Sequence, residues 1–465
     1  MLIKARQQRQ GGRPVLPWHS FVLVLGRVPG GKKQRQSVYD GMVLDIHNDP
    51  NRQHDFFFMF SSRVEAPSTL RPYKTHLPQP ASCGDSYRVL PLRIHSESSS
   101  MKLNDALHRD NNNADLLRLI AACAVIWGHA YALVPGSTTT EPIGQLLGFD
   151  YSGSLAVEFF FFLSGILVTN SWINNSSPLN FILARFFRVF PAVLVSAAAC
   201  VLLLGPMLTT LPLNSYFSNS TVFTAIFRHP YVEYSLPGVF EHSNNPLTNG
   251  SIWTIRYELI MYAMLLAAGL CGVFRHKLFA TVVLISILAI SMFFPEEVEM
   301  IGLMNVNIGG RLPAFFAFGA LLALYKDQAS INIRIVSGLI LFAWICRHGS
   351  AFQFVFYPAF LITALWLMTT EPIKALRLPG DFSYGVYVFG WPIQQVMAAV
   401  FPNFGVHANQ VVTIAASLAL ASISWFVIEK PCIRYGRQLG RYFAAHSSRE
   451  ANAEATLVTV RRPSE

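Results

Sequence analysis

A succession of apolar segments, most of them about as long as a membrane-crossing helix, constrains the fold more than any other feature of this sequence. A helix rises 1.5 Å per residue, so roughly 20 apolar residues cross the hydrocarbon core of a bilayer. The sequence predicts ten such segments, at residues 115–134, 152–172, 183–204, 251–271, 278–294, 308–325, 333–347, 351–369, 383–400 and 411–429. The chain is therefore predicted to be all-α, a polytopic integral membrane protein with about ten transmembrane helices.

Composition supports this class and excludes others. Hydrophobic residues make up 52% of the chain and charged residues 13%, whereas about a quarter of a soluble domain is charged. Most of the basic excess lies in the first 100 residues, so the apolar body gives no electrostatic reason to expect nucleic-acid binding. The cysteines form no C-x-x-C pair, and the sequence predicts neither a metal site nor a permanently bound cofactor.

The composition changes at residue 101 and again near the C-terminus. Residues 1–100 form a basic leader with only two short apolar patches, and we expect it to be largely disordered. A second interpretation is that this leader is not part of the native protein and that Met101 is the true start, which the intact mass of natively expressed protein would test. Residues 101–445 are predicted to form the ten-helix membrane domain and residues 446–465 a polar C-terminal tail.

The loop charges predict the orientation. Lys and Arg accumulate on the cytoplasmic side of membrane proteins, and an inside N-terminus places most basic loop residues of this chain there. Both termini are therefore predicted to be cytoplasmic. The longest connection, residues 205–250, then lies outside, and its Asn, Ser, Pro and aromatic residues suit contact with a sugar or another polar acceptor.

Two ionisable residues in the first predicted helix indicate a functional face. Arg118 and His129 are eleven residues apart, which places them on one face of the helix about 16 Å apart along its axis. Ionisable side chains inside a membrane are costly and usually face a protein interior or a wet cavity. We therefore interpret the face that carries Arg118 at one end and His129 at the other as a candidate functional site.

Two carboxylates are expected at the depth of His129. Glu158 and Glu258 each lie six or seven residues from the outer end of their helices, and Arg256 and Arg311 enter from the same side. A histidine with a carboxylate partner is a general-base pair, in which the carboxylate orients the imidazole and stabilises its protonated form. A hydroxyl acceptor arriving from outside could lose its proton there.

The inner end of the same face is rich in arginine. Arg118 is joined there by Arg185 and Arg188, which mark the inner end of the third predicted helix. Guanidinium groups are good phosphate ligands. A donor with phosphates at the inner surface and a reactive group on a long thin arm could reach from these arginines to His129, and coenzyme A thioesters have that shape.

Structural interpretations remain open for each of these residues. His129 could be a structural or proton-relay histidine, and the three arginines could snorkel as topology markers. Glu158 could be an ion-pair partner of Arg118 or Arg256, and Glu258 could be structural as well. Small residues such as Ser164-Gly165 and Gly319 are expected to allow close helix contact without carrying chemistry.

Several stretches of the chain resemble acyltransferase family 3, a family of membrane proteins. Arg118 and His129, separated by ten intervening residues, are similar to the family's first-helix signature, and the other similar motifs follow in the family's order. They are Val157–Leu167, Phe181–Pro191, Ile252–Glu258 with Tyr262, Arg311–Gly319, Phe382–Tyr387 and Trp425–Pro431. The likeness covers about residues 115–435. Three positions differ from the family pattern: Glu158 replaces the usual aspartate, Arg256 stands where a small or apolar residue is common, and Gly390-Trp391-Pro392 replaces a histidine-proline pair.

The resemblance implies transfer of an acyl group, often acetyl, from a cytoplasmic acyl-CoA to a hydroxyl of an extracytoplasmic carbohydrate. The sequence is accordingly interpreted as an O-acyltransferase of the bacterial inner membrane, with acyl-CoA as its donor substrate and a surface polysaccharide or its lipid-linked precursor as acceptor. His129, Glu258 and Glu158 are the predicted catalytic residues. The predicted substrate-binding residues are Arg118, Arg185, Arg188, Arg256, Trp253, Tyr262 and Arg311.

One alternative function belongs to a different class. A proton-coupled transporter or flippase of lipid-linked sugars would use His129, Arg118 and the glutamates as a proton relay. Movement of the sugar in proteoliposomes without acyl-CoA would favour the transporter, and consumption of acetyl-CoA would favour the enzyme. The sequence predicts no oligomeric state.

Overall fold

The computed structural model describes residues 38–39, 42–43, 100–136, 140–228, 235–294 and 310–460, with side chains beyond residue 446 left out of the description. The chain divides into two units, Met1–Arg93 and Ile94–Glu465. In the first unit, β1 (Val38–Tyr39) pairs antiparallel with β2 (Met42–Val43). The rest of the predicted leader, apart from residue 100, lies outside the described residues, and so do residues 295–309.

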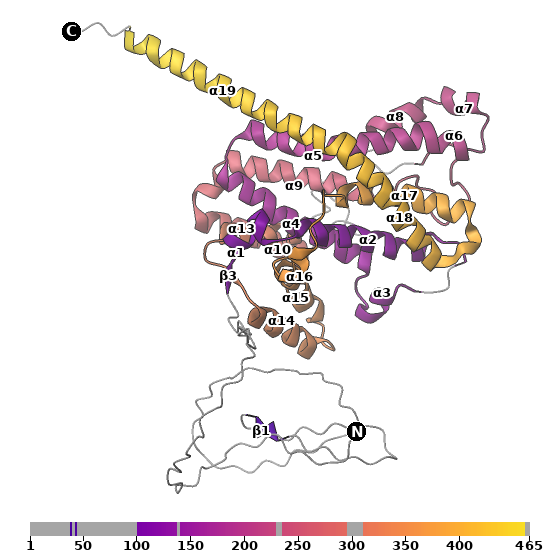
Figure 1. Cartoon of the computed structure of the whole chain (residues 1–465), viewed down its shortest axis with the longest axis horizontal. Coiled ribbons are helices and arrows are strands. Elements are labelled where there is room, and N and C mark those ends of the chain that lie inside the picture. Colours follow the sequence, from indigo (N-terminus) through magenta and orange to yellow (C-terminus); the bar gives the residue numbers. More distant parts are fainter. Residues whose placement is uncertain are drawn as a thin grey trace, which may run out of the picture. The chain divides into compact units, whose positions relative to one another are not determined.

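The second unit is a bundle of helices (Figure 1). Each of the ten predicted segments contains a helix. These helices are α2 (Ala114–Leu133), α4 (Ser152–Asn174), α5 (Pro178–Ala199), α9 (Trp253–Leu270), α10 (Lys277–Phe293), α13 (Leu312–Leu324), α14 (Ile333–Cys346), α15 (Phe352–Leu367), α17 (Ser383–Val400) and α18 (Gly405–Ser424).

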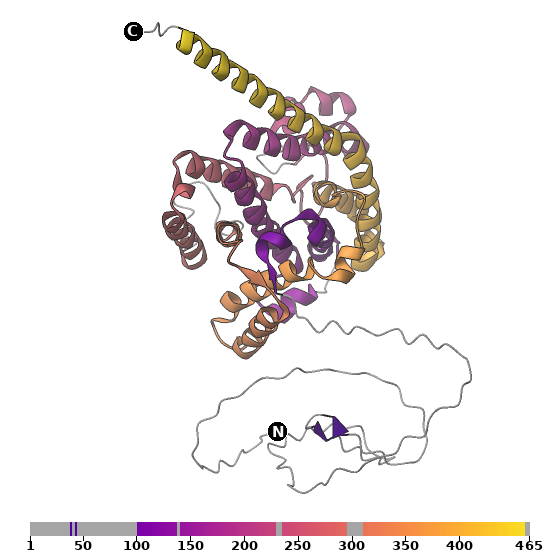
Figure 2. The same cartoon turned by 60° about the vertical axis from the view of Figure 1, so that its left-hand side comes forward.

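Shorter elements and one long helix complete the described part of this unit. The π-turns η2 (Cys200–Leu204) and η5 (Trp425–Glu429) extend α5 and α18, and α19 (Lys430–Val460) leaves the bundle as one long helix (Figures 1 and 2). The remaining elements are β3 (Met101–Lys102), α1 (Leu103–Ala106), η1 (Arg109–Asn111), α3 (Pro142–Leu147), α6 (Gly205–Leu208), α7 (Leu213–Ser218), α8 (Ser220–Arg228), η3 (Val273–Arg275), β4 (Ser330–Ile331), α16 (Glu371–Ala375) and η4 (Pro402–Phe404).

The described helices have membrane character. Four helical stretches among them are long and apolar enough to cross a bilayer: Ala114–Leu133, Ser152–Asn174, Pro178–Leu208 and Pro402–His446. Four further apolar helices, α10, α13, α14 and α15, are shorter. The number of ten spans and the cytoplasmic side of both termini stay predictions. The helix that contains residue 446 continues without a break to residue 460, so no change of backbone marks the predicted boundary of the C-terminal tail.

The core forms around α4, which packs closely against α13. A Cβ atom on Gly165 would lie 2.1 Å from the carbonyl oxygen of Phe316, and one on Gly319 would lie 2.1 Å from the carbonyl oxygen of Phe162. The two glycines therefore let each backbone settle against the other, as small residues do at helix contacts in membranes. The prediction that Gly165 and Gly319 serve close helix contact is confirmed.

The start of α2 is tied to the loop that precedes α17. The side-chain oxygen of Asn113 caps α2 by accepting a hydrogen bond from the backbone amide of Leu116 at 3.2 Å. Its side-chain nitrogen donates to the carbonyl oxygens of Ile373 and Leu376, at 2.7 and 3.0 Å. One asparagine thus brings the arginine-bearing end of α2 next to a segment more than 250 residues further along the chain.

The connection predicted to lie outside is partly helical. In its described part, α6, α7 and α8 pack around the buried Tyr216, whose hydroxyl donates to the carbonyl oxygen of Val201 at 3.0 Å. The end of this connection packs on α17. There the Trp391 indole donates to the carbonyl oxygen of Leu247 at 3.0 Å, and the Gln395 amide donates to the carbonyl oxygen of Asn245 at 2.6 Å.

The glycine contact between α4 and α13 predicts a position-specific loss of stability. Gly165→Ala forces two backbones apart and should lower the free energy of unfolding by about 1–3 kcal/mol. Gly338→Ala is the matched control, because a Cβ atom at Gly338 in α14 meets nothing within 4 Å. Thermal unfolding of the two purified variants measures the difference, and equal midpoints would contradict the role given to Gly165.

Candidate active site

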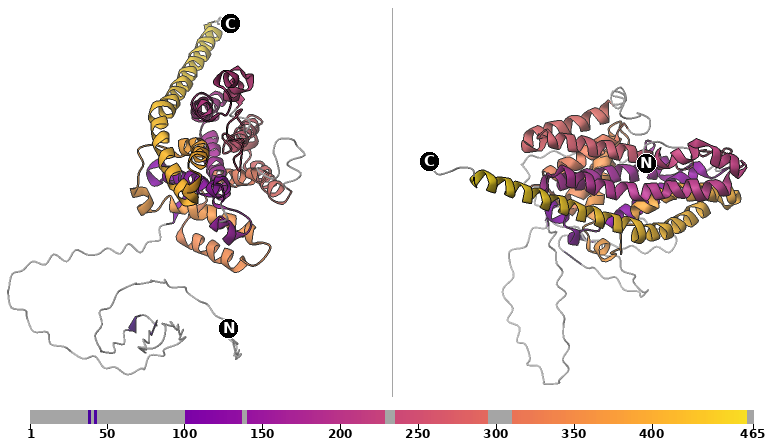
Figure 3. Two further views of the ribbon diagram at one scale, coloured as in Figure 1. Left: turned by 90° about the vertical axis from the view of Figure 1, so that its right-hand side faces the viewer. Right: turned by 90° about the horizontal axis from the view of Figure 1, so that it is seen from above.

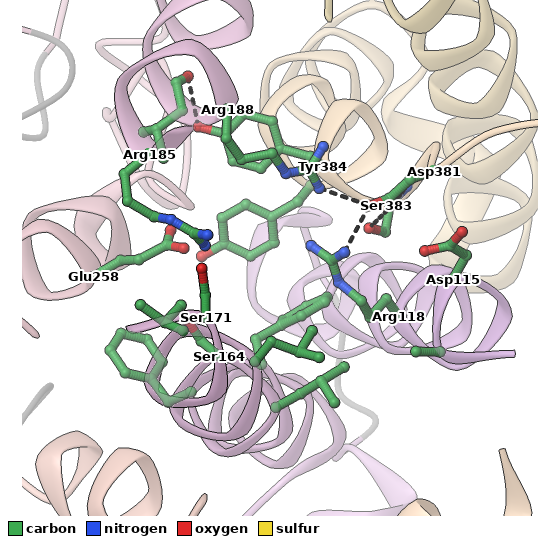
Figure 4. Close-up of a pocket in the computed structure, with 18 of the residues that line it drawn as sticks. Asp115, Arg118, Ser164, Ser171, Arg185, Arg188, Glu258, Asp381, Ser383 and Tyr384 are labelled. Atoms are coloured by element: carbon green, nitrogen blue, oxygen red, sulfur yellow. Dashed lines mark hydrogen bonds and ion pairs between the residues drawn. The ribbon is translucent and has the colours of Figure 1, made fainter. Parts of the chain in front are cut away.

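The helices enclose a cavity of about 760 Å³ at the end of the bundle where α2 and α5 begin. This volume is within the usual range for a small-molecule site, roughly 300–1,000 Å³. Its walls come from α2, α4, α5, α9, α17 and α19 together with the loops before α2 and α17. Residues far apart in the sequence therefore converge on one pocket (Figure 4).

The pocket is strongly basic. Its lining carries three carboxylates, Asp115, Glu258 and Asp381, and twice as many arginines: Arg109, Arg118, Arg185, Arg188, Arg377 and Arg437. Apolar side chains such as Val157 and Phe161 line the remainder. A pocket that combines a basic end with an apolar wall suits a ligand with phosphate groups and a thin, less polar arm.

A buried aspartate organises the inner part of this pocket. Oδ2 of Asp381 accepts hydrogen bonds from Arg118 at 2.6 Å and from Arg188 at 2.7 Å. The hydroxyl of Ser383 donates to the other carboxylate oxygen at 2.5 Å. Burial by itself would raise the pKa of Asp381, but the two guanidinium groups and the bonds from Ser383 lower it to about 2. The carboxylate is therefore ionised at physiological pH and joins α2 to α5.

Arg188 has a second acidic neighbour. Its Nη1 lies 3.6 Å from Oε2 of Glu429, a buried residue of the π-turn η5. The hydroxyl of Ser424 donates to Oε1 of Glu429 at 3.0 Å. A π-turn shifts the register of a helix and is often found at functional sites. Here the shifted turn carries the carboxylate that faces Arg188.

Glu258 and Tyr262 form a second polar group on the wall of the pocket. The Tyr262 hydroxyl donates to Oε1 of Glu258 and lies 3.2 Å from the hydroxyl of Ser164 on α4. The guanidinium of Arg185 lies 5.6 Å from the centre of the Tyr262 ring, and its buried Nε has no hydrogen-bond partner among the described residues. Arg185 and Glu258 point toward each other in Figure 4. This group can bind a polar ligand atom with both donors and an acceptor.

His129 lies beyond the deep end of the pocket and does not line it. Its ring packs edge-on against Trp391, with ring centres 4.8 Å apart. Trp391 follows Tyr387 by four residues on α17, so the two share a face about 6 Å apart along the axis. Tyr387 lines the pocket, and its hydroxyl lies 2.6 Å from that of Thr254. Tyr387 therefore stands one helical turn before the level of His129.

Buried amides hold the segment of α2 that carries His129. The Gln394 side chain donates to the carbonyl oxygen of Ile126 at 2.8 Å, and the Gln410 side chain donates to that of Trp127 at 2.9 Å. Ser152 of α4 donates to the carbonyl oxygen of Ala124 at 3.3 Å. Three helices thus fix the backbone just before His129, which limits the orientations open to its imidazole.

The remaining predicted residues lie elsewhere. Glu158 is buried on the far side of α4, where it interacts with Asp150, Arg311 and Tyr357. Arg311 donates to the Tyr357 hydroxyl at 2.9 Å, and that hydroxyl donates to Asp150 at 3.0 Å. The interpretation of Glu158 as an ion-pair partner of Arg118 or Arg256 is wrong, because Arg118 pairs with Asp381 and Arg256 donates to Tyr257, whereas the basic residue that acts on Glu158 is Arg311.

Arg256 and Trp253 also lie apart from the pocket. Arg256 is exposed and donates to the Tyr257 hydroxyl at 2.8 Å, and Trp253 packs edge-on against the Tyr257 ring. Arg118, Arg185, Arg188, Glu258 and Tyr262 are the predicted residues that share the pocket. His129, Glu158, Trp253, Arg256 and Arg311 are not among its lining residues.

The prediction that His129, Glu158 and Glu258 meet as one catalytic group is wrong. No hydrogen bond or ion pair among the described residues joins His129 to Glu158 or Glu258, and the two glutamates face different polar groups. The position of a residue in the sequence predicts its depth along a helix, but it does not predict which neighbouring helix its side chain faces. The sequence analysis did not identify Asp381, which lines the pocket together with Ser383 and Tyr384. Its position directly before the Phe382–Tyr387 motif is the signal that could have identified it.

Comparison with known proteins assigns the family. The profile of acyltransferase family 3, described as an acyltransferase domain, matches residues 111–429. The chain belongs to this family. It is an acyltransferase, and the matched segment contains most residues of the pocket together with His129.

Two relatives support the assignment. The O-acetyl transferase of Shigella phage Sf6 is 26% identical over 340 residues, which cover 69% of this chain and 95% of the relative. Nodulation protein 10 of Rhizobium leguminosarum bv. viciae is 28% identical over 359 residues, covering 70% of this chain and 93% of the relative. No solved structure matches this chain.

The bridge at Asp381 predicts a large stability effect. Asp381→Asn leaves the partly buried guanidinium of Arg118 without its counter-ion and Arg188 with Glu429 as its remaining acidic neighbour, and should lower the free energy of unfolding by about 3–5 kcal/mol. Glu371→Gln is the control, because it removes a 2.7 Å pair with Lys374 in which the glutamate side chain is 87% exposed, a kind of pair typically worth about 1 kcal/mol or less.

The same substitution has a defined pH dependence. A carboxylate whose pKa is lowered on folding stabilises the fold above its ordinary pKa of 3.8, and this contribution is lost as the pH falls through about 2. The stability difference between the wild type and Asp381→Asn should therefore stay constant at neutral pH and shrink only in strong acid. Unfolding midpoints measured across pH test this, and a difference that already shrinks near neutrality would contradict the bridge.

Proposed function

We propose that this protein is a membrane O-acyltransferase that moves an acyl group, acetyl in the simplest case, from acyl-CoA to a hydroxyl of a carbohydrate. The acceptor is a surface polysaccharide or its lipid-linked precursor, and the enzyme works in the bacterial inner membrane with acyl-CoA on the cytoplasmic side. The observation that carries this proposal is the basic pocket below His129, whose arginines and apolar wall suit a phosphorylated thioester. The name of the phage relative, O-acetyl transferase, favours acetyl.

The donor enters by the arginine-rich end of the pocket. Its diphosphate lies near Arg118, Arg188 and Arg185, and its arm extends along the apolar wall of α4. Asp381 holds the guanidinium groups of Arg118 and Arg188 against one carboxylate oxygen, so that their remaining N–H groups are close together. Two adjacent guanidinium groups match the paired oxygens of a diphosphate.

The thioester must then approach His129. About 16 Å of helix axis separates Arg118 from His129, a distance suited to the long arm of the donor. Tyr387 and Thr254 mark the deep end of the pocket, one turn before His129. The carbonyl carbon therefore passes the Tyr387 hydroxyl on its way to the imidazole.

The acceptor comes from the opposite side. The segment at residues 244–250 packs on Trp391, which contacts His129, and Asn244 donates to the carbonyl oxygens of Ala132 and Val134 at the end of α2. This segment belongs to the connection whose polar and aromatic composition suits a sugar. The acceptor hydroxyl is placed between this connection and the imidazole.

The chemistry requires one base. His129 takes the proton from the acceptor hydroxyl, the new C–O bond forms at the thioester carbon, and the C–S bond breaks as the thiol leaves with the proton. A second route transfers the acyl group first to the imidazole and then to the hydroxyl. Both routes conserve protons overall and need no metal or redox group. Glu258 remains the candidate carboxylate of the pocket, and it binds Tyr262 in the state described here.

Loss of the base should abolish transfer. His129→Ala should reduce acylation of the acceptor by about 10²–10⁴-fold, because a general base contributes that much, while the protein still inserts and unfolds normally. His348→Ala is the matched control, because this exposed histidine lies in the turn between α14 and α15 and does not line the pocket. Transfer of labelled acetyl groups from acetyl-CoA, with NMR of the surface polysaccharide, measures the effect. Full acylation by the His129 variant would end the proposal.

A further inference from the structure

The pocket contains two groups of arginines that differ in exposure. Arg118 and Arg188, the inner arginines, have side chains that are 22% and 18% exposed and share the carboxylate of Asp381 at 2.6 and 2.7 Å. The mouth arginines, Arg109, Arg377 and Arg437, stand at the rim, where the side chains of the first two are 84% and 58% exposed. The inner arginines are fixed by a buried counter-ion, and the mouth arginines are not.

The mouth arginines have weak or no ionic partners. Arg109 lies 3.5 Å from Asp115, and Arg377 lies 3.7 Å from the carboxylate of Asp110, whose side chain is 95% exposed, and donates to the exposed carbonyl oxygen of Asp110 at 3.0 Å. Exposed pairs of this kind contribute little because water and salt screen them. Among the described residues Arg437 has no ion pair. The three guanidinium groups can therefore exchange water or a weak partner for an incoming anion at little cost.

The C-terminal helix carries Arg437 to this position. Two glycines on α19 lie against α5: a Cβ atom on Gly436 would come 2.5 Å from the Phe187 ring, and one on Gly440 would come 2.4 Å from the Asn180 side chain. Ile433 and Arg437, one turn apart, line the pocket beside this contact. Close packing of α19 on α5 thus brings an arginine to the mouth from a helix that otherwise leaves the bundle (Figures 1 and 3).

We propose that Arg109, Arg377 and Arg437 form a separate phosphate site that binds the donor phosphate furthest from the thioester, which in coenzyme A is the 3′-phosphate of the ribose. This inference rests on the proposed function, since it takes acyl-CoA as the donor. The inner arginines then face the diphosphate, and the mouth arginines face the outermost dianion. A phosphate at the rim keeps part of its hydration, because some of its oxygens still bind water. Three guanidinium groups are therefore enough to bind the remaining oxygens. Arg109 and Arg437 lie outside the family match at residues 111–429.

The site is tested by binding of nucleotide to the purified full-length protein in detergent. The probes are coenzyme A and 3′-dephospho-coenzyme A, which differ only in the outermost phosphate. Arg437→Ala should weaken binding of coenzyme A about tenfold, as expected for one charge-assisted contact, and leave binding of the dephosphorylated probe unchanged. Arg434→Ala is the matched control, because Arg434 is exposed on the same helix but does not line the pocket. The tenfold difference should shrink as salt is raised.

The outcomes separate this site from the proposed function. Equal affinities of the wild type and Arg437→Ala for coenzyme A, or an equal loss for both probes, would overturn the phosphate site, and so would a wild type that binds neither probe. A selective loss for coenzyme A in a protein that transfers no acetyl group would retain the site while rejecting the proposed reaction. Acetyl transfer that continues with an unchanged KM for acetyl-CoA in Arg437→Ala would retain the reaction and reject the site.

Discussion

The bridge from Arg118 through Asp381 to Arg188 is the interaction on which the pocket depends. Two guanidinium groups from different helices repel each other, and the repulsion is strong where little water reaches them. The Asp381 carboxylate accepts a hydrogen bond from each at 2.6 and 2.7 Å, and Ser383 supplies a further donor. The negative charge of Asp381, in the loop before α17, thereby allows the two positive charges of Arg118 and Arg188 to lie side by side. The same carboxylate fixes three chain segments around the site.

The donor pocket and the histidine occupy successive levels of the bundle. Arginines surround the entrance, apolar side chains of α4 line the middle, and Tyr387 stands at the deep end, one turn before Trp391 and His129. Such an order favours a ligand that is charged at one end and reactive at the other. It also keeps the phosphates away from the imidazole, so binding energy gained at the arginines can position the thioester without placing charge next to the base.

The two ends of α2 are held in different ways. Its first turn is fixed by Asn113, which caps the helix and donates to the loop after α16, and by the ion pair of Arg118. Its last turns are fixed by neutral amides, including Gln394 and Gln410, that donate to backbone carbonyls near His129. Charged partners at the basic end and neutral ones near the imidazole leave the histidine without a neighbouring fixed charge among the described residues.

The sequence by itself determined the helical class of the fold, the family and several of the residues that line the pocket. Apolar segments of spanning length predict helices because a bilayer leaves the backbone no other way to satisfy its hydrogen bonds, and each of the ten segments contains a helix. The spacing of Arg118, Arg185 and Arg188 also predicted a basic pocket, because residues near helix starts on the same side of a membrane lie at similar depth.

Tertiary structure alone decided which side chains meet. Depth follows from position along a helix, but direction depends on how each helix is rotated against its neighbours. Glu158 and Glu258 were expected at one depth, and yet they belong to different polar groups. Asp381 could not be predicted from the sequence for a related reason. Its function depends on Arg188 and Arg118, which lie 193 and 263 residues away in the sequence and which folding brings within 2.7 Å of its carboxylate. Arg437 likewise reaches the mouth because two glycines let α19 approach α5, a contact that no local pattern encodes.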